Sequence, residues 1–88
     1  MRIRRSHKLG VEEARRRADH IAGHLEKQFS LTSQWHGDYL IVKGNGVDGH
    51  LAVEEESIEI VIKLGFALKL MEGPIRSVIE RDIDDHLV

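Results

Sequence analysis

The middle of the chain alternates apolar and polar residues, and short turn-forming pairs interrupt this alternation. These pairs are Gly37-Asp38, Asn45-Gly46 and Glu55-Glu56. Asn-Gly is the strongest hairpin signal of the three and predicts a type I′ turn, and Gly-Asp suits a type II′ turn. Glu-Glu is poor turn chemistry, so the third loop is the least constrained. Residues 33–62 are therefore predicted to form an antiparallel meander of four strands.

The register of this meander follows from counting outward from each turn. Trp35 then lies opposite Leu40 across the first hairpin. Leu51 lies opposite Leu40 across the second hairpin and opposite Ile60 across the third. A shift of one residue in any hairpin would move these side chains to opposite faces. The three turns agree on one apolar face, and we expect these residues to be buried there: Trp35, Leu40, Leu51, Val53, Ile60 and Ile62.

Two amphipathic helices flank the meander. Residues 11–29 carry apolar side chains at helical spacing, Gly10 can serve as the N-cap, and Glu12 and Glu13 suit the positive end of the helix dipole. A second helix is predicted after Gly73-Pro74, because proline is favoured in the first helical turn. The apolar stripe of the second helix is Ile75, Val78, Ile79, Ile83 and Leu87.

The chain has 88 residues, which predicts a single domain over residues 1–88. Residues 1–6 are expected to add a short edge strand with Ile3 pointing inward. The predicted class is α+β, in the order β-α-β-β-β-β-α. The antiparallel sheet is covered on one face by both helices, because a sheet buries its apolar side against another layer. This arrangement resembles a miniature helix-grip layout.

The apolar alternation continues past the meander through Leu64, Phe66, Leu68 and Leu70. We therefore expect a long last strand that bends at Gly65, since an isolated glycine in a strand often marks a bulge. Two interpretations of this segment stay open. Its side chains either form core under the second helix, or they form an exposed apolar contact segment of Phe66, Leu68, Leu70 and Met71.

Composition excludes several classes of protein. The chain has no cysteine, which excludes disulfides and thiolate metal sites. A formal net charge of −2 argues against a nucleic-acid binder. The sequence shows neither a signal peptide nor a transmembrane segment, so we expect a cytoplasmic protein.

Two histidine-containing pairs have the four-residue spacing of helical neighbours. They are His20 with His24, and Asp82 with His86. The first pair can bind a metal, but the sequence places no third ligand, so we expect weak binding at best. The second is half of a catalytic pair, but no motif places a nucleophile beside it. We therefore expect no catalytic residue, no metal site and no cofactor, and hence no enzyme.

The open face of the predicted sheet is mixed in character. The register places His36, Tyr39, Ile41, His50 and Val61 there. Such a face is either solvated or an interface with a partner, because tyrosine is enriched at interfaces. Closed twofold dimers are the commonest oligomers, so we expect a homodimer formed through this face.

Several stretches together are similar to one known family. The stretches are Ile3-Arg4-Arg5-Ser6-His7, Leu9-Gly10-Val11-Glu12-Glu13-Ala14-Arg15, Trp35-His36-Gly37-Asp38, Gly46-Val47-Asp48-Gly49, Lys63-Leu64-Gly65-Phe66 and Gly73-Pro74-Ile75. They resemble the polyhydroxyalkanoic acid system proteins, which are short bacterial proteins linked to polyhydroxyalkanoate storage granules. The resemblance implies a cellular setting and transfers no catalytic residue.

Two hypotheses of function follow. In the first, the chain is a non-enzymatic accessory protein that acts at the granule surface or on a granule protein. In the second, it is a small binding domain that holds an acyl or hydroxyacyl ligand between sheet and helix. A close-packed core would count against the second.

Overall fold

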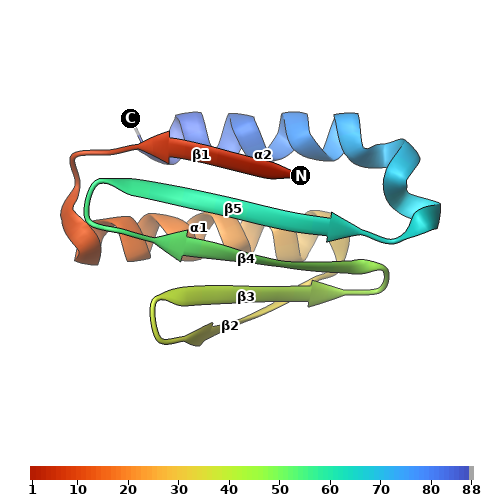
Figure 1. The fold of residues 1–88 in the computed structure, drawn as a ribbon, viewed down its shortest axis with the longest axis horizontal. Coiled ribbons are helices and arrows are strands. Elements are labelled where there is room, and N and C mark those ends of the chain that lie inside the picture. Colours follow the sequence, from red (N-terminus) through yellow and green to blue (C-terminus); the bar gives the residue numbers. More distant parts are fainter. Residues whose placement is uncertain (88) are drawn as a thin grey trace.

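The computed structural model describes residues 1–87 and has the predicted α+β class and element order. Five strands form one antiparallel sheet in the order β1-β5-β4-β3-β2, and both helices lie along one of its faces (Figure 1). The two helices run in opposite directions (Figure 1). The elements are β1 (Arg2–Ser6), α1 (Gly10–Phe29), β2 (Thr32–His36), β3 (Tyr39–Gly44), β4 (Val47–Val53), β5 (Ser57–Leu64), the 3₁₀ helix η1 (Phe66–Met71) and α2 (Glu72–Leu87).

The predicted register of the meander is confirmed at all three turns. Trp35 pairs with Leu40, and Leu51 pairs with Leu40 on one side and Ile60 on the other. Residue Ile3 of the edge strand β1 pairs with Ile60 and points into the core, as predicted. The core side chains that the sheet contributes are Ile3, Leu40, Val42, Val47, Leu51, Val53, Ile58, Ile60 and Ile62.

The two helices fit the sheet in different ways. The buried face of α1 is rich in alanine, which lets the helix approach the sheet and α2 closely; it consists of Ala14, Ala18, Ile21, Ala22 and Leu25. The buried face of α2 consists of larger side chains, Ile75, Ile79 and Ile83. We expected Leu87 to belong to the apolar stripe of α2, but its side chain lies outside the part of the chain whose burial is described.

Trp35 is on the predicted face but is only half-buried, so our expectation of full burial was wrong. The reason is that β2 is an edge strand, which has no neighbour on its outer side. Trp35 donates a 2.7 Å hydrogen bond from Nε1 to Asp19 Oδ1, and the guanidinium carbon of Arg15 lies 4.1 Å from the ring centroid. The indole therefore packs against the edge of the core and is in contact with two polar residues of α1.

The last strand ends at Leu64, and the predicted extension through Leu70 was wrong. The partner of Leu64 is Val47, the first residue of β4, so the sheet offers no partner beyond it. The chain turns instead: Gly65 donates a 2.7 Å hydrogen bond to the carbonyl of Gly46, and η1 begins at the next residue. Phe66, Leu68 and Leu70 therefore lie in a short 3₁₀ helix and not in a strand.

The turn at Asn45-Gly46 also differs from the type I′ turn that we predicted. A type I′ turn requires positive φ at both central residues. Gly46 has a φ of 80°, but Asn45 does not have positive φ. Positive φ at the second residue alone is the pattern of a type II turn.

No helix within residues 1–87 has the length and apolar character needed to cross a membrane.

Replacing Ile60 tests how much the fold depends on the buried face. Its side chain is fully buried and pairs with Ile3 and Leu51. We expect Ile60→Ala to lower the free energy of unfolding by about 2–5 kcal/mol, because the cavity adds to the lost transfer free energy. Chemical denaturation measures this. Val61→Ala, at the next residue but on the open face, is the control and should cost less than half as much; equal losses would contradict the assignment of faces.

Candidate functional site

The open face of the sheet carries a short apolar row across its three central strands. Val61 pairs with His50, and His50 pairs with Ile41, and all three side chains are half-buried by their neighbours. Tyr39 is half-exposed and meets the His50 ring edge-on, with the ring centroids 5.3 Å apart. His36 is opposite Tyr39 on β2 and is exposed. The structure therefore brings the five residues of the predicted interaction face onto one surface.

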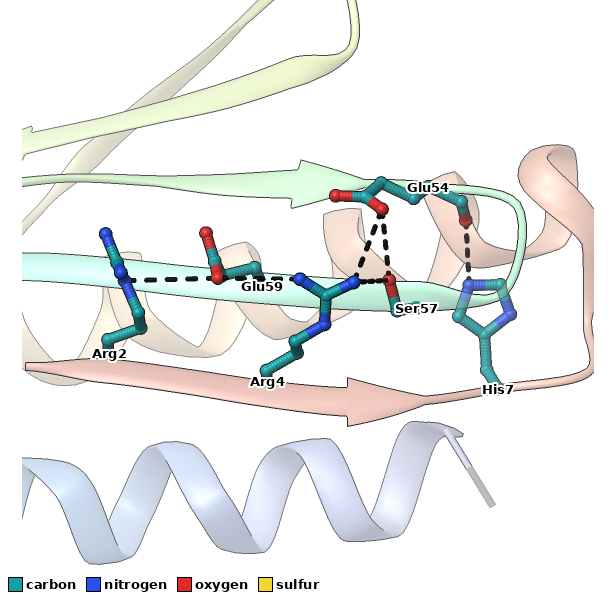
Figure 2. Close-up of polar contacts among 6 residues, drawn as sticks. All are labelled: Arg2, Arg4, His7, Glu54, Ser57 and Glu59. Carbon is teal, nitrogen blue, oxygen red and sulfur yellow. Dashed lines mark hydrogen bonds and ion pairs between the residues drawn. The ribbon is translucent and has the colours of Figure 1, made fainter.

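A network of paired charges borders this row at the β1 edge (Figure 2). Arg4 donates from Nη2 to Ser57 Oγ at 3.2 Å, and the same nitrogen lies 3.6 Å from Glu54 Oε2. The Oε2 atom of Glu59 lies 3.9 Å from Arg4 Nη1 and 3.9 Å from Arg2 Nε. Exposed ion pairs of this kind contribute little to stability. Their effect is to neutralise the charges beside the apolar row, as in the polar rim of an interface.

His7 is a buried polar residue that our sequence reasoning did not single out. Its Nδ1 accepts a hydrogen bond from the Leu9 amide at 3.2 Å, so Nε2 is the protonated nitrogen and donates to the Glu54 carbonyl at 2.9 Å (Figure 2). The side chain is only 5% exposed. His7 thus ties the loop before α1 to the β4–β5 turn, which is a structural role. Nothing in the local pattern of apolar residues indicates it.

Three apolar side chains project from the corner between β5 and α2. Phe66 and Leu70 are each 93% exposed and Met71 is 49% exposed. We call these three residues the apolar tip. Leu68, the fourth residue of the predicted contact segment, turns inward and packs against the core. Two interpretations were left open for this segment. The exposed interpretation is correct for the apolar tip, and the core interpretation is correct for Leu68.

The two histidine-containing pairs of the sequence meet between α1 and α2. The rings of His20 and His86 stack, with centroids 5.8 Å apart, and the His24 and His86 centroids are 5.3 Å apart. The Nδ1 atom of His24 lies 3.4 Å from Asp82 Oδ1. We call His20, His24, Asp82 and His86 the helix-pair cluster. Within residues 1–87, no group of three or more His, Asp or Glu side chains could hold a metal ion.

The space between sheet and helices is filled. A void of about 10 Å³ lies there, lined by apolar side chains that include Leu25, Val47, Ile62 and Ile79. This is about the room that one water molecule needs, and it is far smaller than a site for a small ligand. An acyl chain would have to displace core side chains to enter.

A comparison with protein families decides the identity of the chain. A family model described as "Putative polyhydroxyalkanoic acid system protein" matches residues 1–87. The chain belongs to the polyhydroxyalkanoic acid system protein family. No curated protein and no solved structure matches it.

The structural role of His7 in this polyhydroxyalkanoic acid system protein can be tested by removing its imidazole ring. His7→Ala removes the partners of the Leu9 amide and the Glu54 carbonyl. We expect the free energy of unfolding to fall by about 1–3 kcal/mol, because buried polar groups that lose their partners carry a desolvation cost. Thermal or urea unfolding measures the change. The control is His36→Ala, which alters an exposed histidine and should change stability by less than about 0.5 kcal/mol. If His7→Ala lowered the free energy of unfolding no more than this control does, the structural role of His7 would be contradicted.

Proposed function

We propose that this protein is a non-enzymatic accessory protein of cytoplasmic polyhydroxyalkanoate storage, and that it attaches to the granule surface through the apolar tip. The observation that carries this proposal is the 93% exposure of Phe66 and of Leu70. Large apolar side chains that project this far from a small protein favour contact with an apolar surface. The polyester of a storage granule, with its alkyl groups and uncharged esters, offers such a surface.

The apolar tip is held by backbone contacts. Gly65 donates to the Gly46 carbonyl at 2.7 Å, and Leu68 donates to the Gly65 carbonyl at 2.9 Å. At the far end, the Glu72 amide donates to the Lys69 carbonyl as α2 begins. Leu68 adds an anchor in the core. Little backbone freedom is lost when such a segment binds, so most of the burial energy contributes to attachment.

The strength of this attachment can be estimated. Full burial of a phenylalanine or leucine side chain contributes about 1.5–3 kcal/mol. Phe66 and Leu70 together then supply roughly 3–6 kcal/mol before the entropic cost of association, so the dissociation constant for one copy is at best on the order of tens of micromolar. One copy of the chain therefore attaches weakly and reversibly. Two linked copies bind far more tightly, because the second contact becomes intramolecular.

A second surface supports the pairing of two copies. The row of Val61, His50 and Ile41 places apolar area on the face that the helices leave open, and the paired charges of Arg4 and Glu59 border it. An apolar centre inside a polar border is the usual anatomy of an interface. A twofold axis would bring the same patch of each copy together. The filled interior, in contrast, counts against an acyl-binding function.

Removing the apolar tip should release the protein from granules. We expect Phe66→Ser combined with Leu70→Ser to abolish cosedimentation with isolated granules, because the apolar area available for burial is lost. Val11→Ser changes another exposed apolar residue, 39% exposed and located on α1, and should bind like the wild type. Protein-free polyester particles distinguish the two possible targets. Binding to native granules alone would indicate a granule protein as the partner, and undiminished binding of the double variant would refute attachment through the apolar tip.

Sedimentation tests the homodimer. We expect the wild type to sediment as a dimer at high concentration and Ile41→Glu to sediment as a monomer, because a carboxylate resists burial in an apolar interface. Val11→Glu adds the same charge elsewhere and should stay dimeric. A wild-type monomer at every concentration would exclude the dimer, and loss of the dimer in Leu70→Ser but not in Ile41→Glu would move the interface to the apolar tip.

A further inference from the structure

Three exposed lysines lie at the same end of the molecule as the apolar tip. Lys43 is the next-to-last residue of β3, Lys63 is the next-to-last residue of β5, and Lys69 belongs to η1. Asp48 of β4 pairs with both Lys43 and Lys63, so these two lysines lie at one end of the sheet. The 3₁₀ helix η1 projects beyond that end (Figure 1). We call Lys43, Lys63 and Lys69 the tip lysines.

Two open hollows of the surface connect the tip lysines. Lys63 and Lys69 line a hollow of about 440 Å³ beside η1. Lys43 and Lys63 line a second hollow, of about 270 Å³, on the open face of the sheet. Lys63 belongs to both hollows, so the three lysines lie along one strip of surface that leads from the sheet to η1.

The charges of the tip lysines are not neutralised by the protein. Within residues 1–87, the cation of each ion pair is an arginine, a histidine or the amino terminus, and never a lysine. Asp48 offsets one of the three charges, and Glu72, in the hollow beside η1, lies 3.8 Å from the amino-terminal nitrogen. A positive excess therefore remains beside the apolar tip, and such an excess attracts anionic surfaces.

Exposed apolar side chains beside unpaired lysines match the two layers of an anionic lipid surface. The acyl layer accepts side chains such as Phe66 and Leu70, and it requires no complementary shape. The aliphatic stem of a lysine can lie along this layer while its ammonium group contacts the phosphates of the head groups. Each lysine near an anionic lipid surface raises the affinity by about a factor of five. An uncharged polyester surface engages the apolar tip alone.

We propose that this end of the molecule docks on an anionic lipid surface, with the apolar tip in the acyl layer and the tip lysines on the head-group phosphates. The inference rests on the proposed attachment through the apolar tip and adds the chemistry of the surface that receives it. Together the three lysines raise the affinity by on the order of 100-fold over that of the tip alone. One copy of the chain then binds an anionic lipid surface much more tightly than an uncharged one.

Cosedimentation of the chain with lipid vesicles tests this docking. Vesicles of phosphatidylglycerol and phosphatidylcholine in equal parts should bind the wild type on the order of 100-fold more tightly than vesicles of phosphatidylcholine alone. Lys63→Gln combined with Lys69→Gln should lower the partition coefficient for the anionic vesicles by about 25-fold. The control is Lys8→Gln, which removes an exposed lysine beside Glu55 and Glu56, away from the tip, and should bind like the wild type.

Salt and an uncharged surface separate the lipid docking from the attachment to polyester. Raising the sodium chloride concentration should weaken binding to the anionic vesicles, because salt screens the lysines, and should not weaken binding to protein-free polyester particles. The double lysine variant should bind those particles like the wild type, since its apolar tip is intact. Phe66→Ser combined with Leu70→Ser should bind neither surface. Circular dichroism checks that the variants fold.

The possible outcomes distinguish the two proposals. Equal binding to both kinds of vesicle, wild-type binding by the double lysine variant, or an equal loss in Lys8→Gln would each overturn docking through the tip lysines. Undiminished vesicle binding by the double tip variant would also overturn it, because charge alone would then hold the chain. If the wild type bound polyester but neither kind of vesicle, the lipid docking would be refuted and the attachment to polyester would stand. The reverse result would refute the attachment to polyester alone.

Discussion

The burial of one apolar sheet face beneath two helices is the constraint on which the rest of this structure depends. Ile60 at the centre of β5 is in contact with both of its strand neighbours, Ile3 on one side and Leu51 on the other. A shift of any strand by one residue would expose these side chains, so the register is strongly specified. The alanines of α1 then allow the helices to close over the sheet, and little space remains inside. With the interior filled, any surface of this protein that binds a partner has to lie on the outside.

Those surfaces have different physical characters. The open sheet face has an apolar row bordered by paired charges, which suits contact with another folded surface. The apolar tip has two side chains that stand almost free of the protein, which suits a soft or irregular apolar surface. The energy available from the tip is small for one copy, so the proposed pairing through the sheet face would strengthen the proposed attachment through the tip. In this way two modest surfaces can produce a firm attachment.

The junction of the helices adds a third feature. Three histidines and Asp82 lie where the two helices pack on each other, and Asp82 carries a buried oxygen without a hydrogen-bond partner. In the rest of the chain that the structure describes, the buried side-chain nitrogen and oxygen atoms have partners, as His7 does in two backbone groups. A single uncompensated carboxylate next to three imidazoles is therefore unusual within this fold.

The class, the element order and the register of the meander follow from the sequence, because a two-residue turn and the period of a strand leave one pairing that gathers the apolar residues. The sequence also indicated which residues share the open face. The tertiary structure alone decided where the last strand stops, because that depends on β4 offering no partner beyond Val47. It likewise left Trp35 half-exposed on an edge strand and required glycine at position 49, where a Cβ atom would lie 2.5 Å from the Val61 carbonyl oxygen. Above all, it joined His20 and His24 to Asp82 and His86. Periodicity describes each helix separately, and only the packing of one helix on the other fixes which of their residues meet.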